Sequence, residues 1–405
     1  MRSIHIYLSE NPVWSKVIFY SVTVFFIFFA DAILSYWAPN LLEEKLGNAT
    51  LMGLVMAMSS VVGLIVDIVL PNLLAKTSSG KLLVLAVFTS LIFALLLIVG
   101  VSWPLVFIFL LSMAVWGLYY EFIIFANQLF VAGHVPFVFH SGAWAIIGVF
   151  KNFAYLLGPL ASSYLITKNA IYPGVAAGVL TLFGLTALLV VKNGRNQVIH
   201  VDLKNINLIA ESKKWLVLLT RVWPVIVISL VLGLVDSVFW TTGALMSGSI
   251  LFLYQLPSLF VGFVIVKWGI YKGKKKFAEM FLLLSGLFLS FFVFANGQFT
   301  IEILVFISSL FSAFTYPLID GVYSDVVGRM GNEKRHLIGF SSAAISFSYI
   351  VGPILAGLMT TAVGEKMTFA YLGIFVMIVS VILLLTTPKK LLLPQTEIKS
   401  WGIDN

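Results

Sequence analysis

The sequence predicts an all-α integral membrane protein, and three observations support that fold class. Of the 405 residues, 60% are hydrophobic and only 10% are charged, whereas soluble domains carry about 25% charged residues. Long apolar runs recur along the whole chain, so the hydrophobic surplus is not confined to one compact core. Lysine and arginine gather in alternate loops. A chain with these properties needs a bilayer as its main solvent.

Twelve runs are long enough to cross a membrane as helices. The hydrocarbon layer requires about 20 apolar residues in helical form, because backbone amides there must be bonded within the segment. The predicted spans are residues 15–38, 50–74, 81–101, 103–130, 139–166, 170–191, 215–240, 243–268, 277–298, 301–328, 336–362 and 367–386.

Basic residues give the expected orientation. Alternate loops and the two termini together carry twenty lysines and arginines, whereas the intervening loops carry only Lys45, Lys168 and Lys366. Cytoplasmic loops are enriched in these residues, so we expect both termini to be cytoplasmic, in a multi-pass protein of the cell membrane. The net charge of +8 is then a topology signal, and no nucleic-acid partner is expected.

Several functional classes lack their usual motifs. The chain has no cysteine, which excludes disulfides and thiolate chemistry. It has no glycine-rich phosphate loop and no His-Glu-x-x-His motif, and its five histidines lie at or outside the ends of the spans. We therefore expect no enzymatic activity, no metal site and no cofactor.

The longest polar stretch divides the chain into halves of six spans. It predicts an N-terminal bundle at residues 1–191, a central cytoplasmic loop at 192–214, a C-terminal bundle at 215–388 and a cytoplasmic tail at 389–405. The expected architecture is two pseudo-symmetric six-helix bundles.

An internal repeat supports this division. Span five contains Gly158-Pro159 and span eleven contains Gly352-Pro353 at the same depth, and we expect both pairs to serve helix packing. One such coincidence could arise by chance, because glycine and proline are common in membrane helices. The loops after spans two and eight also match, each being short, basic and glycine-containing. Transporters built on two rocking halves show repeats of this kind.

At the loop after span two, the sequence resembles the major facilitator superfamily, whose signature there is Gly-x-x-x-Asp-Arg/Lys-x-Gly-Arg-Arg/Lys. The stretch Pro71-Asn-Leu-Leu-Ala-Lys76-Thr-Ser-Ser-Gly80-Lys81 keeps a basic residue and a glycine but lacks the acid. Over the eight residues Gly262-Phe-Val-Ile-Val-Lys267-Trp-Gly269, the second copy lacks only the acid.

The resemblance covers essentially the whole chain and implies the twelve-helix major facilitator fold, with secondary active transport by alternating access. It also implies that Lys76 and Lys267 take part in cytoplasmic gating. The gating contact of the missing acid is then either absent or supplied by another residue, for which Asp67 is the candidate. The Gly-Pro pair of span five resembles part of the family's antiporter motif, but Ser162 and Ser163 replace its further glycines.

Ionisable residues inside the spans are the candidates for the solute and proton pathway. A charge at mid-bilayer costs about 3 kcal/mol on insertion scales, so such residues usually face a cavity or a partner. Asp31 and Asp236 occupy corresponding places in spans one and seven, and we expect them to bind protons, with a helix-packing hydrogen bond as the alternative. The other candidates are Glu121, Lys151 and Asp320.

Glu121 and Lys151 lie at similar depth, which predicts an ion pair, either static or remade during transport. Lys151, Tyr155, Gly158 and Ser162 share one helix face, which we expect to form a cavity wall. Trp240, one turn after Asp236, is the second aromatic candidate for such a wall.

These features favour a secondary active transporter of a small solute, proton-coupled, with export of a drug-like or amphipathic compound as the first expectation. Import of a nutrient is the first alternative. A receptor or assembly protein that kept the transporter shape is the second. The expected partners are the solute, protons and the lipid bilayer, and the expected state is a monomer.

Overall fold

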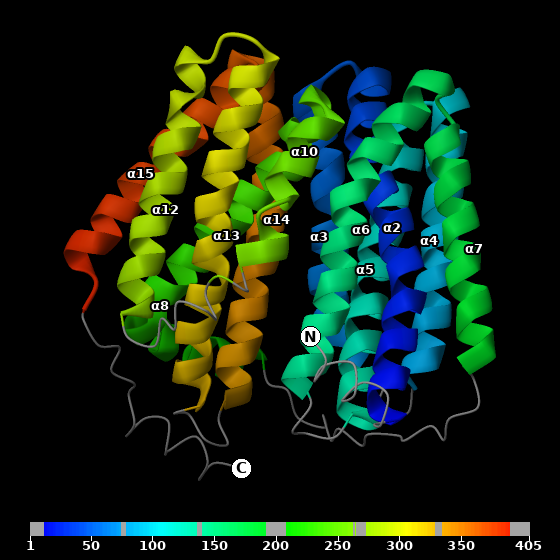
Figure 1. Cartoon of the computed structure of the whole chain (residues 1–405), viewed down its shortest axis with the longest axis horizontal. Helices are drawn as coiled ribbons and strands as arrows, with labels where there is room; N and C mark the ends of the chain where they lie inside the picture. The colour runs from blue at the N-terminus through cyan, green and yellow to red at the C-terminus, as the bar shows by residue number, and fades with distance from the viewer. Residues whose placement is uncertain are drawn as a thin grey trace. The chain divides into compact units, whose positions relative to one another are not determined.

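The computed structural model describes residues 12–73, 78–135, 140–191, 208–261, 264, 273–328 and 334–388. Nearly all of these residues are helical, and no strand occurs among them (Figure 1). The first six helices are α2 (Pro12–Leu46), α3 (Ala49–Leu73), α4 (Ser79–Ser102), α5 (Val106–His134), α6 (His140–Lys168) and α7 (Tyr172–Val191). The later elements are α8 (Leu208–Val238), η2 (Phe239–Gly243), α9 (Ala244–Met246), α10 (Gly248–Gln255), α12 (Lys274–Ser290), η3 (Phe291–Phe294), α13 (Gln298–Gly328), α14 (Lys334–Val363) and α15 (Glu365–Thr386).

The helices match the predicted membrane spans. Within the described residues, nine helices are long and apolar enough to cross a bilayer, and two apolar helices, Tyr172–Thr186 and Gly248–Val261, are shorter. With the 29 residues of α6, these helices account for every one of the twelve predicted runs. Large apolar side chains such as Phe107, 72% exposed, lie on the outside, where lipid is the solvent that suits them. The predicted all-α membrane fold is confirmed.

The first compact unit comprises Met1–Leu203 together with Ser247–Phe252. In this unit α2 lies against α6 and α7, α4 lies against α5 and α7, and α3 lies against α5. Close approach depends on glycine: a Cβ on Gly117 of α5 would lie 3.0 Å from the carbonyl carbon of Ser59 on α3. Small residues at such contacts allow close van der Waals packing between helices. This packing holds helices together inside a membrane, where the hydrophobic driving force between them is missing.

The second compact unit comprises Lys204–Met246 and Leu253–Asn405. Its most extensive contacts join α8 to α14, α12 to α13, and α12 to α15. When the six spans of this unit are numbered in chain order, these contacts join the first span to the fifth, the third to the fourth, and the third to the sixth. The first unit joins the same three pairs as α2 with α6, α4 with α5, and α4 with α7.

The helix that follows Asp236 departs from regular α-helix. Residues Phe239–Gly243 form the π-helix η2, in which each hydrogen bond spans one residue more than in an α-helix. Thr241 Oγ1 donates to the carbonyl of Ser237 at 2.7 Å, and Thr242 Oγ1 lies 2.9 Å from Thr360 Oγ1. The corresponding helix of the first unit, α2, is continuous α-helix from Pro12 to Leu46.

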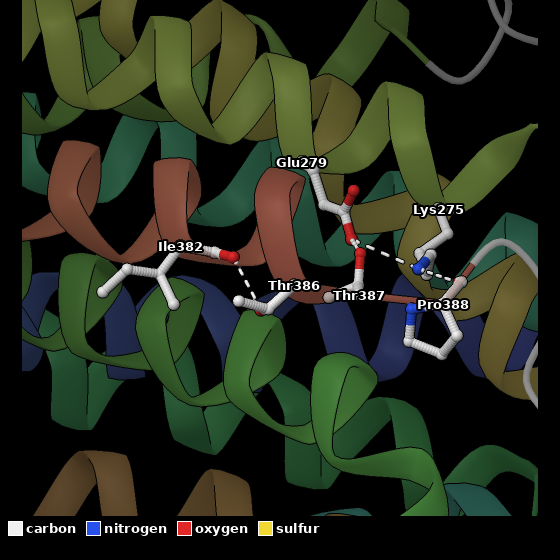
Figure 2. A network of polar contacts seen from close by, with 6 residues as sticks. All are labelled: Lys275, Glu279, Ile382, Thr386, Thr387 and Pro388. Carbon is white, nitrogen blue, oxygen red and sulfur yellow. Dashed lines mark hydrogen bonds and ion pairs between the residues drawn. The ribbon is translucent and has the colours of Figure 1, made fainter.

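A polar network ties the end of α15 to the first turns of α12 (Figure 2). Glu279, 2% exposed, accepts a hydrogen bond from Thr387 Oγ1 at 2.8 Å. Lys275 Nζ lies 3.6 Å from the Glu279 carboxylate and donates to the carbonyl of Pro388 at 2.5 Å. A buried charge is costly unless it is paired and hydrogen-bonded, and this network supplies both kinds of partner.

Candidate functional site

Asp31 lies at the centre of a hydrogen-bonded cluster in the first unit. Its side chain, 1% exposed on α2, accepts hydrogen bonds at both carboxylate oxygens. Trp116 Nε1 on α5 donates to Oδ1 at 2.7 Å, and the Tyr155 hydroxyl on α6 donates to Oδ2. Because an ionised carboxylate only accepts, this arrangement satisfies the charged form at both oxygens.

The glycine of the Gly-Pro pair brings Tyr155 within reach of Asp31. A Cβ on Gly158 would collide with the side chain of Ala32 and lie 2.8 Å from its carbonyl carbon. Residues three apart on a helix lie on one face, so the tyrosine stands one turn before this contact. The close approach of α6 to α2 at Ala32 therefore positions the phenol against the neighbouring aspartate.

Aromatic rings enclose the Asp31 cluster. Trp116 stacks on Phe93 with centroids 5.1 Å apart and lies 5.3 Å from Tyr120. The Tyr120 hydroxyl lies 3.5 Å from the Tyr155 hydroxyl, and either can donate. Indole and phenol donors therefore form most of the polar surface that Asp31 meets.

Lys151 places a positive charge beside this cluster. Its Nζ lies 5.7 Å from the ring centroid of Tyr155 and 5.9 Å from that of Phe28. An ammonium group over aromatic rings is held by the ring quadrupole. The lysine side chain is exposed, whereas Tyr155 and Gly158 are buried. The predicted wall face of α6 is thus partly a packing face toward α2.

Asp236 has a cluster of the same design in the second unit. The Tyr254 hydroxyl on α10 donates to Oδ1 at 2.6 Å, and the Tyr349 hydroxyl on α14 donates to Oδ2. A Cβ on Gly352 would collide with the side chain of Ser237. Asp236 is partly exposed.

The two clusters correspond element by element. In each unit, the tyrosine that precedes the Gly-Pro pair by three residues donates to the aspartate, and the glycine of the pair contacts the next residue after that aspartate. The repeat in the sequence is therefore a repeat of a side-chain arrangement.

The remaining candidates differ in their burial. Glu121 is 8% exposed on α5, and a Cβ on Gly63 of α3 would lie 3.0 Å from its Oε1. Its ion pair with Lys151 stays a prediction. Asp320 is exposed on α13, and Trp240 is partly exposed in η2.

Most of the predicted gating residues lie outside the described residues. These are Lys76, Gly262, Lys267 and Gly269, together with the side chain of Asp67. Gly80 is described in the first turn of α4, with no atom within 4 Å of the position of a Cβ.

Sequence reasoning assigned no hydrogen-bonding role to three donors: Trp116, Tyr254 and Tyr349. A signal existed for Trp116, because Trp116, Tyr119 and Tyr120 follow the i, i+3, i+4 spacing of one helix face. A signal also existed for Tyr349, because it stands three residues before the second Gly-Pro pair, as Tyr155 stands before the first. Within the described part of the chain, no group of three or more histidine, cysteine or acidic side chains could hold a metal ion.

Comparison with known proteins identifies the fold. Residues 240–402 match the family model described as Major Facilitator Superfamily. No curated protein sequence matches the chain.

Solved structures of transporters are similar over nearly the whole chain. The human organic anion transporter MFSD10 (TETRAN) has 14% identity and a TM-score of 0.62, with 92% of this chain and 100% of that chain covered. The nucleoside transporter NupG has 13% identity and a TM-score of 0.67, with 93% and 100% covered. A peptide transporter POT in complex with sulfate has 13% identity and a TM-score of 0.70, with 91% and 93% covered.

Proposed function

From its major facilitator superfamily signature at residues 240–402 and its fold, we propose that this chain is a secondary active transporter of a small solute. Two six-helix halves, residues 1–191 and 215–388, alternate in opening a central site to the two sides of the membrane. Protons supply the driving force. The protein acts as a monomer in the cell membrane, with both termini in the cytoplasm.

The duplicated aspartate cluster carries this proposal. A buried ionisable group is expensive in a membrane protein and usually marks an ion or substrate pathway. Here two aspartates, Asp31 and Asp236, occupy equivalent places, and each is held by donors from neighbouring helices. Hydrogen bonds from movable hydroxyls allow such a group to be charged in one state and neutral in another.

The other candidate residues take supporting roles. Glu121 and Lys151 form a central charge pair that substrate or proton binding rearranges, and Asp320 is a further group on the proton pathway. Tyr155 and Trp240 contribute aromatic surface to the solute path. Asp67, Lys76 and Lys267 contribute to gating on the cytoplasmic side.

Export of an amphipathic or drug-like compound is the favoured direction. The aromatic surroundings of Asp31, with Phe93, Trp116 and Tyr120 in contact, suit an apolar or cationic solute, because ring faces attract cations. Import of a nutrient is the alternative, and the similar structures include proteins named for organic anions, nucleosides and peptides.

Proteoliposomes under an imposed pH gradient test both coupling and direction. Ethidium is the probe for export, and alanyl-alanine and uridine are the probes for import. We expect the gradient to drive movement of one probe, and we expect Asp31→Asn and Glu121→Gln to reduce that movement by about a hundredfold, since a positioned proton-transfer group contributes about that much.

Glu302→Gln is the matched control, because Glu302 accepts a hydrogen bond from Gln298 at 3.0 Å near the start of α13 and is not a residue of either cluster described above. Its transport should equal that of the wild type. Unaltered coupling in Asp31→Asn and Glu121→Gln would remove the proton assignment. If no probe moves and none binds, the receptor or assembly alternative becomes the better account.

A further inference from the structure

A row of phenolic hydroxyls leads away from the buried Asp31 carboxylate. Asp31 is 1% exposed and Tyr155 is 8% exposed, whereas Tyr120 is partly exposed. The Tyr155 hydroxyl donates to Asp31 Oδ2, and the Tyr120 hydroxyl lies 3.5 Å from that of Tyr155. The exposure of the side chains thus increases along the row, from the buried Asp31 and Tyr155 to the partly exposed Tyr120.

The donor at the other carboxylate oxygen restricts where a proton can bind. Trp116 Nε1 points its hydrogen at Asp31 Oδ1 from 2.7 Å, and an indole N–H can donate but never accept. A proton on Oδ1 would therefore face the indole hydrogen. A proton on Oδ2 instead faces the Tyr155 oxygen, which can accept it once the tyrosine hydroxyl rotates.

We propose that Tyr120 and Tyr155 relay protons between water and Oδ2 of Asp31. The relay rests on the proposed function, in which Asp31 is a proton-binding group. During loading, the Tyr120 oxygen takes a proton from a hydronium ion, which leaves as water, and passes its own proton to the Tyr155 oxygen. The Tyr155 O–H bond then breaks as a new O–H bond forms on Oδ2, and both tyrosines end neutral. Unloading reverses each transfer.

The groups around Asp31 suit a relay that loads and unloads a charged carboxylate. Lys151 lies 5.7 Å from the Tyr155 ring centroid, and its positive charge favours the ionised form of the nearby aspartate. Trp116 and Tyr155 stabilise the same form through their hydrogen bonds. The polar or titratable groups that face Asp31 from α5 are Trp116, Tyr119 and Tyr120, and those from α6 are Lys151 and Tyr155.

Tyr119 provides a matched control beside the relay. It neighbours Tyr120 on α5 and is 1% exposed, and its hydroxyl has no hydrogen-bond partner among the described residues. It lies near Asp31 without joining the row. Its replacement by phenylalanine removes a hydroxyl of the same kind while the relay stays intact.

The test measures protonation directly on purified protein in detergent, without a solute. After a rapid fall in pH, time-resolved infrared spectroscopy follows the carbonyl stretch of protonated carboxylic acid, and the band lost in Asp31→Asn belongs to Asp31. We expect Tyr120→Phe to slow the appearance of this band by about a hundredfold, the usual contribution of a positioned proton-transfer group. Tyr119→Phe should leave the rate unchanged, and heavy water should slow the wild-type rate.

Three outcomes would overturn the relay: a wild-type rate in Tyr120→Phe, equal slowing in Tyr119→Phe, or no solvent isotope effect in the wild type. The isotope measurement needs no variant, so a missing isotope effect overturns the relay even if Tyr120→Phe does not fold. The absence of any Asp31-dependent band over the accessible pH range would instead remove the proton role from the proposed function. The two failures are therefore distinguishable.

Discussion

The Asp31 and Asp236 clusters share a scaffold and differ in the donors that complete it. Each has a tyrosine that donates to the aspartate and a glycine that contacts the following residue. The second donor is the indole of Trp116 at Asp31 and the phenol of Tyr254 at Asp236. Asp31 is 1% exposed, whereas Asp236 is partly exposed.

The difference shows which part of a duplicated site is fixed by the backbone and which by side chains. Helix packing sets the position of both aspartates, because the glycine contact recurs in both units. The protonation chemistry depends on the donors. A phenol can donate or accept, so Asp236 can be bonded with a proton on either oxygen, whereas the indole at Asp31 only donates.

The largest expected effect tests the shared scaffold. We expect Gly158→Ala to lower the free energy of unfolding by about 3 kcal/mol and Gly352→Ala by about 1 kcal/mol, within the usual range for overpacking. The new methyl group at Gly158 meets the backbone of Ala32, whereas at Gly352 it meets the side chain of Ser237, which can rotate. Denaturant unfolding in mixed micelles, followed by tryptophan fluorescence, measures both.

Gly148→Ala on α6 is the control for the glycine replacements. No atom lies within 4 Å of a Cβ at this position, and alanine has the higher helix propensity by about 1 kcal/mol. It should therefore be neutral or stabilising. Equal losses at Gly158 and Gly352 would contradict the distinction between a backbone contact and a side-chain contact.

An intermediate effect tests the difference in burial. We expect Tyr155→Phe to lower the free energy of unfolding by about 2 kcal/mol and Tyr349→Phe by about 1 kcal/mol, because hydrogen bonds to charged groups contribute about 1.5–3 kcal/mol. Water can replace part of the lost bond at the partly exposed Asp236 but not at the buried Asp31. The same unfolding assay applies, and a larger loss in Tyr349→Phe would reverse the predicted order.

The smallest effect compares two tyrosines whose hydroxyls do not touch an aspartate. The Tyr119 hydroxyl is buried without a partner among the described residues, whereas the Tyr316 hydroxyl donates to the carbonyl of Leu232 at 3.2 Å. Leaving a buried polar group unpaired destabilises the folded state. Tyr119→Phe should therefore raise the thermal midpoint and Tyr316→Phe should lower it. A fall in both variants would show that the Tyr119 hydroxyl is satisfied in solution.

The number and approximate positions of the membrane-spanning helices could be predicted from the lengths of the hydrophobic runs. Within the described residues, each of the twelve predicted spans contains a helix, because a membrane permits few alternatives to a helix of about 20 apolar residues. The ends of the helices were less predictable. For example, α2 extends to Leu46 and η2 interrupts the line of α8, since contacts between helices decide such local changes.

The aspartate clusters could be predicted only in part from the sequence. The spacing of Asp31, Tyr155 and Gly158 relative to their second-half counterparts pointed to equivalent positions. It could not show that the tyrosines bond the aspartates, because the contact depends on which faces α2 and α6 turn toward each other. Trp116 stayed hidden for the same reason, as α5 brings it to Asp31 from 85 residues away. Glu279 was missed because its partners, Lys275 and Thr387, meet only when α12 and α15 pack.

The π-helix η2 limits how far one half can be used as a template for the other. Successive residues of an α-helix are rotated by about 100°, so one inserted residue turns every later side chain away from its counterpart on α2. Equal spacing along the chain therefore identifies Asp31 and Asp236 as equivalent residues. Beyond Phe239, the equivalent residues of the two helices are offset by one position. The two helices can therefore present unlike residues along their C-terminal ends while their aspartates stay in register.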